Sequence, residues 1–102
     1  MSYENIGPQK FDELMKEGHQ VIDVRPEEEL IEGEIEGHVT INFYDPSFPE
    51  EIDKLDRDKT YLLHCRSGNR SGKACQIMDQ MGFTKLYNLD GGIQAWDDYK
   101  LG

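Results

Sequence analysis

The chain has 102 residues, of which 36% are hydrophobic and 31% charged, and its 11 basic against 21 acidic residues leave a net charge of −10 at pH 7. This size and composition are typical of one globular unit with one core, so we expect a single domain over residues 1–102. The excess of negative charge argues against nucleic acid and anionic membrane surfaces as partners.

Compartment and assembly can also be predicted from the composition. No apolar run approaches the roughly 18 residues of a transmembrane helix. The segment Met1–Asn5 has neither the basic start nor the apolar stretch of a signal peptide. Two cysteines are too few for a disulfide framework, and without an export signal we expect a cytoplasmic location and free thiols. A monomer is expected for a small domain of this charge.

The chain begins with short alternating patterns. Ser2–Ile6 predicts a short strand, and Pro8 suits the first turn of a helix whose apolar residues recur at i, i+3 and i+4. Gly18 is expected to end this helix. Val21–Val24 is short, apolar and rich in β-branched residues, which predicts a buried strand.

The segment between residues 26 and 56 is less regular. Pro26 begins a short helix, with the run Glu27–Glu29 as its solvated first turn. We expect Leu30 and Ile31 to supply the core contacts of this helix. The β-branched run Val39–Asn42 predicts the next strand, and a proline-containing loop and a third short helix follow it.

The second half of the chain is more regular. Tyr61–Leu63 predicts a central buried strand that leads to Cys65, and the helix after it carries Cys75 on its apolar face. A further strand, Lys85–Leu89, precedes a last helix. Strands that alternate with helices imply an α/β domain: a mostly parallel sheet of about five short strands, covered by helices on both faces.

The stretch His64–Lys73 combines features of an anion-binding loop. It contains three cations, Arg66, Arg70 and Lys73, and no carboxylate. Its glycine, serine and asparagine residues suit a tight turn, and the N–H groups of such a turn, backed by a helix N-terminus, attract anions. Because Cys65 stands between the predicted strand and this loop, we expect a lowered pKa and a thiolate.

Three signatures of the chain resemble those of single-domain rhodaneses, sulfurtransferases that carry sulfur as a cysteine persulfide. They are Asp23-Val24-Arg25, Cys65-Arg66-Ser67-Gly68-Asn69-Arg70-Ser71 and Asn88-Leu89-Asp90-Gly91-Gly92-Ile93-Gln94-Ala95-Trp96, in the order of the family. Gly33–His38 departs from the family pattern. The resemblance implies a rhodanese-like three-layer α/β/α domain with Cys65 as its catalytic residue. It assigns the persulfide-binding loop to Arg66, Ser67, Gly68, Asn69, Arg70 and Ser71.

The implied reaction has two halves. The Cys65 thiolate takes a sulfane sulfur from a small anionic donor such as thiosulfate or polysulfide, and a thiol, a protein thiol among them, or cyanide then removes it. We expect Arg66 and Arg70 to attract the donor, one of them through two parallel hydrogen bonds. The sequence contains no metal-ligand cluster, phosphate-binding glycine loop or dinucleotide fingerprint, so we expect neither a metal nor a cofactor.

Four further residues are expected to support the loop. Adjacent residues of a strand point to opposite faces, so His64 should support the loop and not act as a base. Asp23 and Arg25 end a neighbouring strand and should form a structural ion pair or hydrogen bond. Lys73 adds positive charge to the helix that follows the loop.

Two alternatives to a free-standing sulfurtransferase remain open. A persulfide carrier or binding module that serves one partner protein needs the same loop. A phosphatase or arsenate reductase with a catalytic cysteine is disfavoured, because phosphatases of this mechanism have arginine six positions after the cysteine, where this chain has Ser71. For Cys75, a role as a core residue is favoured over one as a resolving thiol.

Overall fold

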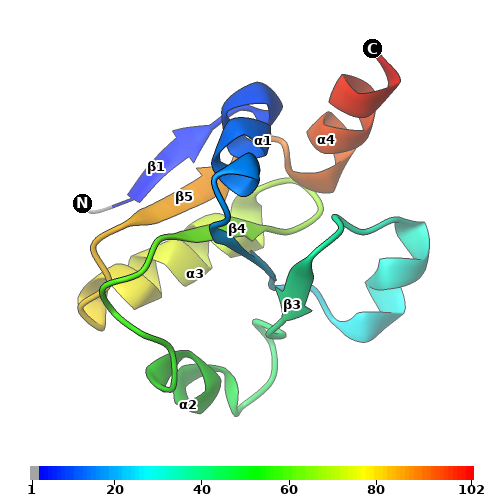
Figure 1. Cartoon of the computed structure of the whole chain (residues 1–102). Helices are drawn as coiled ribbons and strands as arrows, with labels where there is room; N and C mark the ends of the chain where they lie inside the picture. The colour runs from blue at the N-terminus through cyan, green and yellow to red at the C-terminus, as the bar shows by residue number, and fades with distance from the viewer. Residues whose placement is uncertain (1–2) are drawn as a thin grey trace.

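In the computed structural model, which describes residues 3–102, five strands form a single sheet in the order β1-β5-β4-β2-β3 (Figure 1). All of its strand pairs are parallel. The predicted parallel sheet of five short strands is therefore confirmed, although Ser2 lies outside the described residues. The strands are β1 (Tyr3–Ile6), β2 (Gln20–Asp23), β3 (His38–Thr40), β4 (Tyr61–His64) and β5 (Leu86–Leu89).

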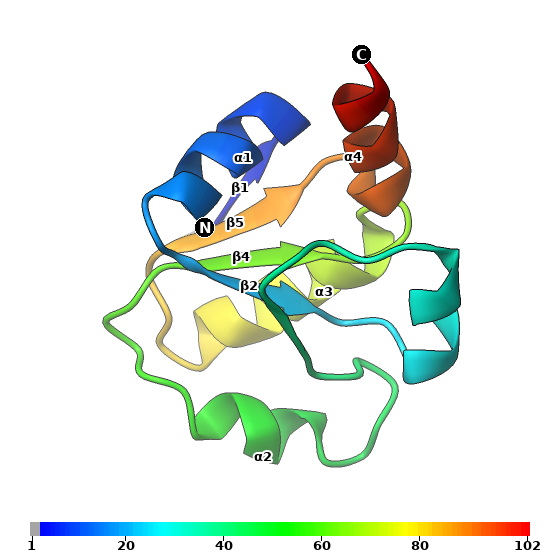
Figure 2. The ribbon, with the colours of Figure 1, turned by 45° about the vertical axis from the view of Figure 1, so that its right-hand side comes forward.

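Helices cover both faces of the sheet, as Figure 2 shows. One face carries α1 (Pro8–Lys16) and α4 (Gly92–Leu101), and the other carries α2 (Phe48–Asp53) and α3 (Asn69–Gln80). Each side has its own core cluster of buried apolar side chains, one with residues from α1 and α4 and the other with residues from α2 and α3. The predicted three-layer α/β/α architecture is confirmed. No described helix has the length and apolar character needed to cross a membrane.

Strand β4 occupies the middle of the sheet, and all four of its residues are buried. Because successive side chains of a strand point to opposite faces, Leu62 packs in the α1–α4 core, whereas Leu63 and Cys65 pack in the α2–α3 core. His64 meets the ring of Phe11 in α1 edge-on, with 6.4 Å between the ring centres. The histidine therefore lies on the α1 side of the sheet.

The segment after β2 differs from its prediction. It forms a 3₁₀ helix, η1 (Glu27–Glu32), in which Ile31 is 92% exposed and Leu30 only partly buried. The expectation that Ile31 contacts the core was wrong, because this short turn lies beyond the end of β2 and the nearby core position is filled by Ile35, which is buried.

Candidate active site

The sulfur of Cys65 lies at the base of the loop between β4 and α3. The backbone N–H of Gly68 donates a hydrogen bond to the sulfur at 3.1 Å, and the Oγ of the buried Ser71 lies 3.4 Å from it. Gly68 has a φ of +99°, which suits glycine, and it directly precedes the first residue of α3. This turn brings the N-terminal end of α3 towards the sulfur, where the helix favours negative charge.

Two opposing effects act on the ionisation of Cys65. Burial by itself would raise the pKa of this thiol, because it disfavours the thiolate. Hydrogen bonds from the Ser71 side chain and from the backbone N–H groups of Ser71, Gly68 and Ser67 outweigh burial and lower the pKa. The predicted lowering of the cysteine pKa is therefore present in the structure, and its source is the loop backbone together with one serine.

Asn88 of β5 ties the loop to the sheet, a contact that sequence reasoning missed. Its Nδ2 donates hydrogen bonds to the carbonyl of Gly68 at 3.0 Å and to Asn5 Oδ1 at 2.9 Å, while its Oδ1 accepts from the Ser71 hydroxyl. The Ser71 hydrogen is thus shared between Asn88 and the Cys65 sulfur. One signal was available, because Asn88 is a polar residue in a strand with buried leucines at both ends.

The start of α4 holds the backbone of the loop from the other side. The N–H groups of Ile93 and Gln94 donate to the carbonyls of Cys65 and Arg66 at 2.9 and 3.3 Å. Gly92 makes this close approach possible, since a Cβ atom on it would lie 2.3 Å from the Arg66 oxygen. Two loop carbonyls are thereby occupied by α4, and a side chain at Gly92 would displace them.

Asp23 and Arg25 form the buried ion pair that we expected. Both side chains are fully buried, and Arg25 donates to the two carboxylate oxygens at 2.7 to 3.1 Å. Burial by itself would raise the pKa of Asp23, but the hydrogen bonds from Arg25 outweigh it and lower the pKa. Arg25 also donates to the carbonyls of Glu29 at 3.2 Å and Gly33 at 2.7 Å, so the pair anchors η1 at the end of β2.

His64 is fully buried beneath the loop. Its Nε2 lies 3.7 Å from Asp23 Oδ2 and has no hydrogen-bond partner among the described residues. Burial lowers the pKa of His64 to about 4, in spite of the negative charge of Asp23, so the imidazole is neutral at pH 7. The ring thus lies on the α1 side of the sheet, on the opposite face from the Cys65 side chain, and its role in supporting the loop stays a prediction.

The basic residues of the loop differ from their prediction. Arg70 donates through both terminal nitrogens to the carboxylate of Glu29, at 2.7 and 2.8 Å, and so is not a free cation. The run Glu27–Glu29 is therefore not wholly solvated, because Arg25 places Glu29 beside the loop. Arg66 is exposed and lies 3.7 Å from Glu32, while Lys73 is exposed on α3.

Cys75 belongs to the core cluster between the sheet and the helices α2 and α3. Cys75 is buried in α3, and burial raises the pKa of its thiol to about 12. Both cysteines are free. Within residues 3–102, no group of three or more histidine, cysteine, aspartate or glutamate side chains is arranged to hold a metal ion.

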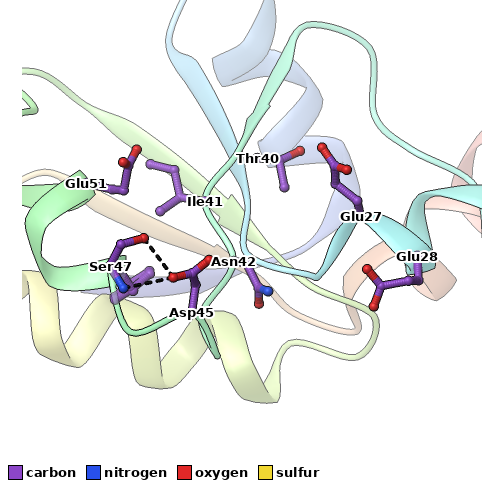
Figure 3. A pocket seen from close by; sticks show the side chains of 9 residues that line it. Glu27, Glu28, Thr40, Ile41, Asn42, Asp45, Ser47 and Glu51 are labelled. Carbon is purple, nitrogen blue, oxygen red and sulfur yellow. Dashed lines mark hydrogen bonds between the residues drawn. The ribbon is translucent and has the colours of Figure 1, made fainter.

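A pocket of about 390 Å³ lies beside η1 and β3, but it does not include Cys65 (Figure 3). Four carboxylates and no basic side chain line it, so it is unsuited to an anionic sulfur donor. Figure 3 shows Ser47 hydrogen-bonded to Asp45 at its rim. The lining residues are Glu27, Glu28, Thr40, Ile41, Asn42, Asp45, Ser47, Phe48 and Glu51.

Known proteins share this fold and sequence. Residues 7–99 match the family described as the rhodanese-like domain. YtwF of Bacillus subtilis (strain 168), named as a candidate sulfurtransferase, is 46% identical over 77 residues, which cover 76% of this chain and 72% of YtwF. The thiosulfate sulfurtransferase GlpE of Pseudomonas aeruginosa is 32% identical over 95 residues, covering 93% of this chain and 84% of GlpE.

A solved structure extends the likeness to the backbone. The crystal structure of a rhodanese-related protein from Thermoplasma volcanium superimposes with a TM-score of 0.82 at 34% identity, covering 95% of this chain and 93% of the other. Together with the match over residues 7–99, these likenesses show that the chain belongs to the rhodanese-like domain family of sulfurtransferases.

Proposed function

We propose that this chain moves a sulfane sulfur from thiosulfate or a polysulfide to a thiol or to cyanide through a persulfide on Cys65. The single observation that carries the proposal is the environment of the Cys65 sulfur, which lies near the start of α3. The Gly68 N–H lies 3.1 Å from this sulfur, and the loop lowers the pKa of the Cys65 thiol. A cysteine that ionises in a nest of N–H groups is a nucleophile that needs no separate base.

The first half-reaction is a displacement at sulfur. The Cys65 thiolate forms a bond to the outer sulfur of thiosulfate, the sulfur–sulfur bond of the donor breaks, and sulfite leaves with its electron pair. The loop N–H groups that stabilise the Cys65 thiolate support this step, because in the proposed reaction they also stabilise the negative charge of the persulfide. An acceptor thiolate or cyanide then bonds to that terminal sulfur and restores the Cys65 thiolate.

The loop also argues against phosphate chemistry. Ser71 occupies the sixth position after Cys65, and Arg70 is one position early and already paired with Glu29. A phosphate needs free donors for three oxygens, whereas a persulfide presents a single terminal atom. The small loop with an occupied arginine therefore fits sulfur transfer better than phosphate transfer.

Intact-mass measurement after incubation with thiosulfate or polysulfide tests the proposal. We expect a gain of about 32 Da, one sulfur atom, which a thiol removes. Cys65→Ser should lose this gain, and the matched variant Cys75→Ala should keep it. A gain that survives in Cys65→Ser, or no gain in the native protein with either donor, would contradict the proposal. Turnover with cyanide would separate an enzyme from a carrier that releases sulfur only to a partner protein.

A further inference from the structure

An ion pair with Glu29 occupies Arg70, one of the two arginines of the loop that follows Cys65. Both terminal nitrogens of Arg70 are bound to Glu29, and its guanidinium also lies 5.8 Å from the ring centre of Tyr44. The two paired side chains are 16% and 24% exposed. A bidentate arginine–carboxylate pair of this kind uses the same donors that would hold a sulfonate.

The position of Glu29 is built into the fold. Arg25, whose side chain is fully buried, donates to the carbonyl of Glu29 itself and to that of Gly33. Arg25 is held in turn by two-point contact with Asp23. A buried ion pair at the end of β2 therefore sets where η1 presents the Glu29 carboxylate to the loop.

Arg70 lies within electrostatic reach of the reacting sulfur. The hydrogen bond to Glu29 raises its pKa most, and the negative charge of Cys65 raises it further. The other loop arginine, Arg66, lies near the carboxylate of Glu32. Two acidic residues of η1 thus offset the two arginines of the loop, so that the exposed Lys73 is the remaining basic residue of the stretch His64–Lys73.

We propose that Glu29 sets donor selectivity: by occupying Arg70, it disfavours donors with two negative charges, such as thiosulfate, relative to sulfane-sulfur donors with a single negative charge. The inference rests on the proposed sulfur transfer. Attack by the Cys65 thiolate on thiosulfate brings three negative charges together and releases sulfite. Attack on a thiosulfonate brings two together and releases a sulfinate. Free Arg70 would favour the first reaction more than the second.

The test compares thiosulfate with methanethiosulfonate, which has a methyl group in place of one charged oxygen. With cyanide as the common acceptor, the ratio of the two kcat/KM values isolates the donor step. Glu29→Gln removes the charge but keeps the size, and we expect it to raise the thiosulfate-to-thiosulfonate ratio about tenfold. Glu28→Gln on the same 3₁₀ helix removes an equal charge from an exposed position and should change the ratio less than about twofold.

The higher thiosulfate-to-thiosulfonate ratio expected in Glu29→Gln must depend on Arg70. Arg70→Gln in the Glu29→Gln background should cancel it, and a gain that persists would overturn the inference. An equal effect of Glu28→Gln, or an unchanged ratio in Glu29→Gln, would overturn it as well. If circular dichroism shows that Glu29→Gln does not fold, the single variant Arg70→Gln provides the test. It leaves the Glu29 charge without a partner, so we expect a lower thiosulfate-to-thiosulfonate ratio. An unchanged ratio would contradict the inference.

The two proposals can fail separately. Absence of a sulfur adduct with both donors in the native protein would remove the proposed function. Adduct formation at Cys65 together with an unmoved donor ratio would leave sulfur transfer intact and remove only the role of Glu29 in selectivity.

Discussion

Cys65 and Cys75 are equally buried and belong to the same core cluster, yet the pKa values of their thiols are shifted in opposite directions. Burial raises the pKa of Cys75 to about 12. Burial acts on Cys65 in the same sense, but the hydrogen bonds of the loop overcome it and lower the pKa. The comparison shows that burial alone does not make a cysteine inert, because the direction of nearby N–H groups decides.

The backbone position of each cysteine explains the difference. Cys65 precedes α3, where the first N–H groups of a helix have no carbonyl partner within the helix and are free to face an anion. Cys75 lies inside α3, where each N–H group is bonded to the carbonyl four residues earlier. The same helix therefore provides donors to one sulfur and none to the other.

The largest expected contrast is in alkylation of the native protein. At pH 7, iodoacetamide should modify Cys65 at least about a hundredfold faster than Cys75, because the thiolate is the reactive form. The rate at Cys65 should fall only as the pH drops through its lowered pKa. Peptide mass mapping over time measures both rates. Similar rates at the two cysteines would break the comparison.

Gly92→Ala should damage the Cys65 environment and leave that of Cys75 in place. The new Cβ would meet the carbonyls of Arg66 and Cys65, at a φ of +59° that already disfavours alanine. We expect a loss of about 3 kcal/mol in the free energy of unfolding and slower alkylation of Cys65. Urea unfolding measures the first effect. Gly7→Ala, at an open position before α1, is the matched control and should have little effect on the Cys65 rate.

His64 extends the comparison, because it resembles Cys75. Each side chain is buried, and burial outweighs any interaction that would stabilise its charged form, so ionisation of both is disfavoured. Its pKa of about 4 lies below the ordinary histidine value of 6.5, so the unfolded chain binds the proton first as the pH falls. Stability from this residue is complete above pH 6.5 and is lost progressively towards pH 4, by about 3 kcal/mol. Urea unfolding at several pH values should show a shallower loss in His64→Gln between pH 6.5 and 5, and an equal slope would refute the assignment.

The smallest effect is expected for Ser71→Ala. Its hydroxyl hydrogen is shared between Asn88 and the Cys65 sulfur, whereas the N–H groups of the loop are unaffected by the substitution. The pKa of Cys65 should therefore rise, because one donor is lost, but it should stay below that of Cys75, because the backbone donors remain. The pH dependence of thiolate absorbance near 240 nm, with Cys75→Ala as the background, measures the shift. A fall in pKa, or a rise that reaches the Cys75 value, would contradict this division of donors.

Local patterns explain which parts of the molecule were predictable. The parallel sheet followed from short apolar runs that alternate with helical spacing, and the tight turn at Gly68 followed from the glycine, serine and asparagine residues between β4 and α3. The side of the sheet occupied by His64 followed from strand alternation alone. Ile31 was misplaced because an apolar residue in a single 3₁₀ turn has no periodic pattern from which its orientation can be inferred.

The sequence by itself determined the chain's order of strands and helices, the loop that follows β4 and the cysteine at its start, since each depends on residues that are neighbours along the chain. Only the tertiary structure decided which groups surround that loop. Glu29 meets Arg70 across 41 positions, and Asn88 meets Ser71 across 17. Such partners are brought together by the packing of η1, β5 and α4 around the end of β4, which no local spacing records.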